Sequence, residues 1–158
     1  MDPHQTAARP DTPAGAGDRF RKILLGFDGS DGARRALAQA LRLALSDGAV
    51  LHVLTVIERL PHYAATVGEV DEALEEGERN AALVQAEVRR AAELQGIEVH
   101  TVVRPGHAAR TLVDYAQEGG FDLLVLGHAG HSSLWGLFLG TTSDKVVRHA
   151  PCSVLIVR

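Results

Sequence analysis

The sequence predicts an α/β fold in which helices cover both faces of one mostly parallel sheet. Five short apolar runs, too brief for helices, alternate with longer segments whose apolar residues recur at helical spacing. Turn signals that contain glycine or proline separate most of these segments. Strands and helices that alternate in this way are joined by right-handed crossovers, so we expect a single doubly wound domain.

The apolar runs differ in ways that indicate their places in the sheet. Lys22 to Asp28 is continuous and ends in an acid, which is typical of a strand buried on both faces. Ala49 to Ile57 is rich in β-branched residues, and Ile97 to Val103 alternates as a strand near an edge does. The other two predicted strands are Leu123 to Leu126 and Cys152 to Val157.

Four helical patterns lie between these runs. Apolar stripes are predicted to reach Leu45 in the first pattern and Leu94 in the second. Gly77 weakens the second pattern as an isolated helix, because glycine is a poor helix former. The four patterns cover about 33–45, 69–95, 109–116 and 142–149.

The composition excludes several function classes. With 158 residues and 46% hydrophobic content, the chain can form one domain with a core. A formal net charge of −4 gives no electrostatic reason to bind DNA or RNA. No apolar run approaches the roughly 20 residues of a membrane span, and the N-terminus lacks the layout of a signal peptide. We therefore expect a cytoplasmic protein.

Two further expectations concern the ends of the chain. Met1 to Asp18 is rich in proline, glycine, alanine and threonine without apolar periodicity, so we expect a flexible tail and a domain over 19–158. Cys152, the only cysteine, cannot form an internal disulfide and is expected to be a small buried hydrophobe.

A glycine-bracketed loop after the fourth strand indicates an anion site. Gly127, Gly130 and Gly140 are separated by two and nine residues, and Thr141 and Thr142 follow at a predicted helix start. Glycine allows a close approach of the backbone, and the free N–H groups of a helix N-terminus favour phosphate. The alternative is a tight loop whose glycines serve chain geometry and whose threonine caps the helix. The loop is not a P-loop, because no Gly-Lys-[Ser/Thr] follows.

These features resemble the universal stress proteins. The glycine spacing matches the G-x2-G-x9-G-[ST] motif of the family's nucleotide-binding branch. FDGSDGA, VRPGHAARTLVDYAQEGGFDLLVLG and SDKVVRHAPCSVLIVR are similar to family signatures in family order, so the resemblance covers nearly all of Arg21 to Arg158. It implies a five-stranded parallel sheet of order 3-2-1-4-5 with two helices on each face.

The resemblance also implies which residues bind an adenine nucleotide, ATP, ADP or AMP, with Mg²⁺ able to accompany it. Asp28 occupies the position that hydrogen-bonds ribose or adenine in the family, although an acid that ends a strand near a helix N-terminus is the structural alternative. Leu51 matches a strand-two position whose backbone meets adenine, but core packing explains it equally well. The remaining implied residues are Gly127, Gly130, His131, Gly140, Thr141 and Thr142.

The loop departs from the family in one respect. Relatives often carry Lys or Arg in the nine-residue gap, whereas this chain has HSSLWGLFL. Without a fixed positive charge, a preference for ATP over ADP or AMP is in doubt. Leu134 to Leu139 either packs beneath the fold or forms a contact patch. His128 and His131 are interpreted as solvated loop histidines, with donation to a phosphate as the alternative.

We therefore expect a nucleotide-responsive regulatory protein of the stress response. The resemblance implies a homodimer that pairs through the C-terminal strand, Cys152 to Val157, whose exposed edge would otherwise need cover. Asp28 with His128 or His131 is the only candidate acid–base set in the sequence, and no catalytic residue is assigned. The alternatives are a nucleotide-independent protein-interaction module that regulates a transporter or stress partner, and a slow ATPase.

Overall fold

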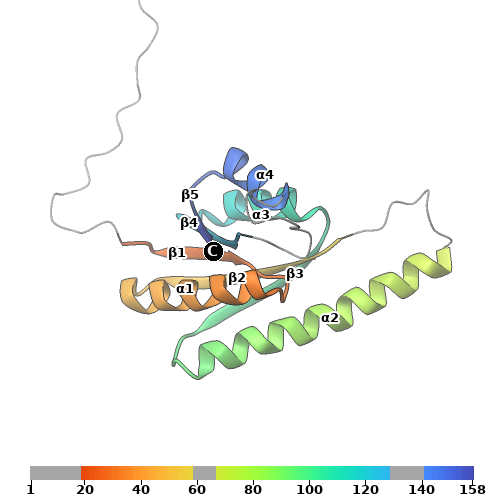
Figure 1. Cartoon of the computed structure of the whole chain (residues 1–158), viewed down its shortest axis with the longest axis horizontal. Coiled ribbons are helices and arrows are strands. Elements are labelled where there is room, and N and C mark those ends of the chain that lie inside the picture. The colour runs from red at the N-terminus through yellow and green to blue at the C-terminus, as the bar shows by residue number, and fades with distance from the viewer. Residues whose placement is uncertain (1–18, 59–66, 129–140) are drawn as a thin grey trace, which may run out of the picture.

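The computed structural model of the chain describes residues 19–58, 67–128 and 141–158, and within these ranges it forms five strands and four helices (Figure 1). The strands are β1 (Lys22–Gly26), β2 (Val50–Ile57), β3 (Val99–Pro105), β4 (Leu123–Gly127) and β5 (Ser153–Val157). The helices are α1 (Asp31–Asp47), α2 (Val67–Glu93), α3 (Ala108–Gly119) and α4 (Thr141–His149).

The strands form one parallel sheet in the order β3-β2-β1-β4-β5, which confirms the predicted topology. The central strand β1 pairs with β2 on one side and with β4 on the other. The three middle residues of β1, Ile23, Leu24 and Leu25, are fully buried, as expected for a strand that is covered on both faces.

Two apolar layers sandwich the sheet. Alternate side chains of the strands point to opposite faces, so each face builds a core of its own. One core joins Ile23 and Leu25 to α1 and α2, and the other joins Leu24 and Leu124 to α3 and α4. Figure 1 shows α1 and α2 on one side of the sheet and α3 and α4 on the other. The predicted two helices on each face are therefore confirmed.

Both predicted apolar stripes extend too far at their C-terminal ends. Leu45 is 63% exposed and Leu94 is 80% exposed, whereas the buried stripes end at Ala44 and Ala92. Leu45 follows Ala44 directly, and one helical step turns it away from the sheet. Leu94 lies beyond the last residue of α2, in the turn that leads to β3.

Gly77 has a packing role in α2 that its low helix propensity does not reveal. A Cβ atom at this position would lie 2.7 Å from the Cγ2 methyl of Ile57, at the end of β2. The glycine therefore lets the helix approach the end of β2 closely.

Cys152 packs against the α3 and α4 core but is only half-buried, so the expectation of full burial is met in part. Burial, and secondarily the nearby charge of Asp122, raises the pKa of its thiol. In the described ranges, no helix combines the length and the apolar character that crossing a membrane requires.

Candidate functional site

The strand order reverses between β1 and β4, which makes their carboxyl ends the expected place for a ligand in this fold. After β1 the chain crosses to β2 on one side, while β4 lies on the other side of β1. β1 ends at Gly26 and β4 ends at Gly127. The segments that follow these two strands therefore meet at the same edge of the sheet.

Asp28 lies in the turn between β1 and α1, two residues after the end of the strand rather than at it. Its carboxylate is exposed, and Oδ1 accepts a hydrogen bond of 2.9 Å from the backbone N–H of Ser30. Ser30 in turn caps α1, because its Oγ accepts from the N–H of Ala33 at 3.2 Å. Gly29, between them, has a φ of 77° that favours glycine. The turn therefore holds the Asp28 carboxylate in place at the start of α1.

Gly127 is required by packing within the protein. A Cβ atom here would lie 2.5 Å from the carbonyl carbon of Gly32 and 2.8 Å from the backbone nitrogen of Ala33. Both atoms belong to the first turn of α1, and a backbone cannot move aside as a flexible side chain can. At this glycine, the chain-geometry explanation is the one that the contacts support.

The first turn of α4 is anchored to the end of β4. The hydroxyl of Ser143 is buried and donates to the carbonyl oxygen of Gly127 at 3.2 Å. Thr141 is exposed and Thr142 is half-buried, so both begin the helix at the molecular surface. The N-termini of α1 and α4 are thus both tied to Gly127, and each contributes partial positive charge at this edge of the sheet.

His128 does not behave as the solvated loop histidine that the sequence suggests. It is 8% exposed, and its backbone N–H donates to the carbonyl oxygen of Val157 at 2.7 Å. This bond continues the pairing of β4 with β5 by one residue beyond Gly127. The useful signal in the sequence is that His128 directly follows a buried strand.

Leu51 lies away from the other predicted site residues. It is fully buried in the core between the sheet, α1 and α2, and it pairs with Ile23 near the start of β1. The residue of β2 beside Gly26 is Leu54. Three residues of strand separate the two positions, which corresponds to about 10 Å. The structure therefore supports the core-packing explanation for Leu51.

Thr55 is a polar group near this edge that the sequence analysis missed. It is buried at the carboxyl half of β2, and its Oγ1 has no hydrogen-bond partner among the described residues. A buried hydroxyl without a partner is costly. The signal was a threonine that interrupts the otherwise apolar run from Val53 to Ile57.

Three predicted positions, Gly130, His131 and Gly140, lie outside the described residues, as does the apolar stretch from Leu134 to Leu139. Among the residues that the structure does describe, no group of three or more His, Cys, Asp or Glu side chains is placed to hold a metal ion.

Comparisons with known proteins agree on one family. A model described as the universal stress protein family matches residues 19–158. A universal stress protein of Thermus aquaticus is 39% identical over 142 residues, which cover 88% of this chain and 99% of that protein. The structure of universal stress protein UspA from Lactobacillus plantarum is similar with a TM-score of 0.80 and 29% identity, over 89% of this chain and 99% of that one.

One of the similar structures that contain a ligand bears directly on the candidate site. It is a universal stress protein in complex with cAMP, which matches with a TM-score of 0.69 and 28% identity over 89% of this chain and 98% of that one.

Proposed function

Because the chain belongs to the universal stress protein family, we propose that it binds an adenine nucleotide at the carboxyl ends of β1 and β4. The observation that carries the proposal is the arrangement around Gly127, which brings the Asp28 turn and the first turn of α4 to one edge of the sheet. An exposed carboxylate can accept hydrogen bonds from hydroxyl groups, and helix N-termini favour a phosphate, so this edge suits a ligand that carries both kinds of group.

The two sides of this edge have different roles in the proposal. The backbone N–H groups at the start of α4, with the hydroxyl of Thr141, bind phosphate oxygens, and the helix dipole favours their charge. Oδ1 of Asp28 already accepts from Ser30, so Oδ2 is the oxygen that accepts a hydrogen bond from a ribose hydroxyl. Mg²⁺ that enters with the nucleotide is held by phosphate oxygens and water.

The lack of positive charge in the loop beside the site bears on how many phosphates the preferred nucleotide carries. Residues 131–139, between Gly130 and Gly140, contain no Lys or Arg. A triphosphate would therefore gain little Coulomb energy over a monophosphate there. Together with the cAMP complex of a relative, this supports AMP or cAMP as ligands at least as good as ATP.

The proposal includes a regulatory homodimer. β5 pairs with β4 along one edge only, and residues Val154 to Val157 are half-buried in the single chain. A second copy that pairs along the free edge would cover it. Nucleotide can then bias this dimer or its contacts with a partner only by binding one state more tightly than the other.

Isothermal titration of the full chain with cAMP, AMP, ADP and ATP tests the proposal. We expect at least one ligand to bind in the micromolar range. Asp28→Asn should weaken binding about tenfold, because it removes the charge from a hydrogen bond to the ligand. Thr141→Ala should weaken it less, because backbone N–H groups remain.

Asp71→Asn is the matched control, since Asp71 is an exposed acid of α2. It should leave every affinity unchanged. If none of the four nucleotides binds to correctly folded protein, the proposal fails, and the nucleotide-independent interaction module becomes the better hypothesis.

A further inference from the structure

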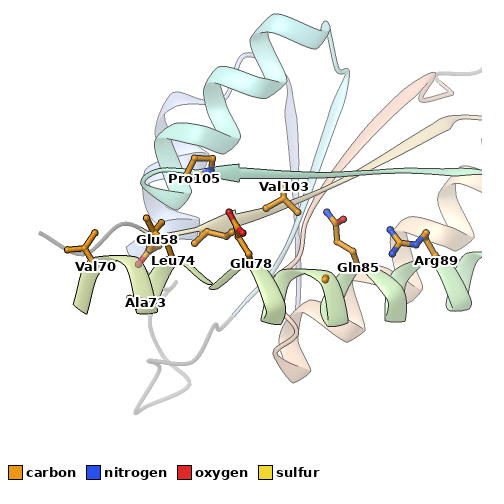
Figure 2. Close-up of a pocket in the computed structure, with 11 residues that line it drawn as sticks. Glu58, Val70, Ala73, Leu74, Glu78, Gln85, Arg89, Val103 and Pro105 are labelled. Atoms are coloured by element: carbon orange, nitrogen blue, oxygen red, sulfur yellow. The ribbon is translucent and has the colours of Figure 1, made fainter. Parts of the chain in front are cut away.

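A groove of about 750 Å³ lies between α2 and the carboxyl halves of β2 and β3, on the β3 side of the sheet (Figure 2). The N-terminal end of α2 extends beyond the sheet (Figure 1), and its residues Val70, Ala73 and Leu74 line one wall of the groove. This volume falls in the range of small-molecule sites. The groove is separate from the proposed nucleotide site, which lies at the ends of β1 and β4.

The floor and walls of the groove are mostly apolar. Ile57, Val103 and Pro105 come from the strands, and Val70 and Leu74 come from the helix that faces them. Val103 has a large apolar side chain that is 37% exposed, although it lies on the face of the sheet that α2 covers elsewhere. An apolar ligand body here would remove this surface from water.

One buried side chain in the groove has an unused hydrogen-bonding group. Gln85 is 7% exposed, and its Nε2 has no hydrogen-bond partner in the ranges that the structure describes. In Figure 2 its side chain projects from α2 toward β3, into the space between them. An unpaired buried amide is costly, and a polar ligand atom beside it would relieve that cost.

The charges of the lining favour a cation. Glu58 and Glu78 both line the groove near Leu74, and neither is in an ion pair within the described part of the chain. Arg89 lines the far end, where its Nη1 donates to Thr101 at 2.9 Å. The eleven residues from Glu78 to Arg89 correspond to about 16 Å along the helix, so the acids dominate at their own end.

We propose that this groove binds a small molecule with an apolar, ring-sized body and one cationic nitrogen. The body packs between Leu74 and Val103, the cation lies beside Glu58 and Glu78, and a polar atom of the ligand meets the amide of Gln85. The anionic phosphates of a nucleotide would be repelled by these acids. The inference is therefore independent of the proposed function.

Three naphthalene probes of nearly equal size test the proposal on the full chain, and ligand-observed NMR measures their binding. They are 1-naphthylmethylammonium, neutral 1-naphthalenemethanol and anionic 1-naphthylacetate. Because Glu58 and Glu78 are exposed to solvent, their attraction for a cation is modest. We therefore expect the ammonium to bind about threefold more tightly than the alcohol, and the acetate to bind most weakly. Added salt should reduce the preference for the ammonium.

Two variants assign the binding to this groove. Glu78→Gln should weaken the ammonium about threefold and leave the alcohol unchanged. Ala73→Trp places a ring in the groove and should abolish binding of both probes, with circular dichroism as the check on folding. Glu76→Gln is the matched control, because Glu76 is an exposed acid of α2 that does not line the groove.

Each result decides the matter. The expected order of probes, lost in Glu78→Gln and kept in Glu76→Gln, supports the proposal. Equal binding of the three probes, no binding at all, or binding that folded Ala73→Trp retains would overturn it. Competition by AMP that Asp28→Asn relieves would place the probes at the nucleotide site and would also overturn it.

Discussion

Gly127 illustrates how a residue of a sequence motif can have a packing role inside the protein. The missing side chain allows the end of β4 to contact the backbone of Gly32 and Ala33, and the carbonyl of Gly127 accepts from Ser143. Three elements, β4, α1 and α4, therefore meet at this one residue. The glycine therefore places the two helix N-termini beside the end of β4.

His52 lies in a cluster of rings on the opposite face of the sheet from α2. Its Nδ1 is 3.1 Å from the hydroxyl of Tyr115, and its ring centroid is 5.0 Å from that of Phe121 and 4.7 Å from that of His100. Lys22 lies over the ring of Phe121. Burial first, then His100 and Lys22, lowers the pKa of His52 below its ordinary value of 6.5.

This shift predicts that the fold loses stability in mild acid. Because the unfolded chain binds the proton more tightly, the stabilising effect is fully present above 6.5 and is lost as the pH falls from there toward the folded pKa. The Tm should fall between about pH 7.5 and about pH 5.5. His52→Gln should make this fall smaller, as measured by circular dichroism.

His107→Gln serves as the control, since His107 is exposed before α3 and makes no side-chain cap. An equal reduction of the pH dependence in both variants would show that the His52 environment is not responsible.

The start of α1 joins the candidate site to the stability of a whole helix. Ser30 is buried, its hydroxyl accepts from Ala33, and its own N–H donates to Asp28. The first N–H groups of a helix have no acceptor inside the helix. The Ser30 cap supplies an acceptor for one of them, the N–H of Ala33. The Asp28 turn and the helix cap form one structural unit.

Ser30→Ala should lower the free energy of unfolding by about 1 kcal/mol, because the N–H of Ala33 loses its acceptor. Urea unfolding measures the change. Ser46→Ala, at an exposed position near the end of the same helix, should be neutral or slightly stabilising. Equal stabilities of wild type and Ser30→Ala would contradict the capping role.

Within the part of the chain that the structure describes, both outer strands of the sheet have one unpaired edge. β3 is partly protected because its neighbour α2 crosses that side of the sheet, with Arg89 bonded to Thr101. β5 is short, and four of its five residues are half-buried apolar side chains. For the molecule as a whole, the β5 edge is the place where a second copy would complete the sheet.

The alternation of backbone groups gives a selective test of dimerisation. The carbonyl of Val157 accepts from His128, so the backbone groups of Val157, Leu155 and Ser153 face β4, and those of Val154 face the free edge. Val154→Pro should therefore block pairing between copies and spare the β4 ladder. We expect a monomer by analytical ultracentrifugation, while Val154→Ala remains a dimer. A wild-type monomer, or a dimeric proline variant, would refute pairing at this edge.

The order of strands and helices, the family, and the places of Asp28 and Gly127 after β1 and β4 were accessible from the sequence. Apolar runs and helical stripes are local patterns, and the turn after β1 and the glycine after β4 are local signals as well. The sheet order followed from the resemblance and agrees with the observed pairing.

Only the tertiary structure decided which groups meet and which are covered. Leu51 and His128 are buried by partners far away in the chain, whereas Leu45 faces away from the sheet and Leu94 lies in the turn after α2. The groove that holds the amide of Gln85 lies between α2 and the strands β2 and β3, which are distant from the helix residues in the sequence. Burial depends on neighbours that no local pattern specifies, so it had to be read from the fold.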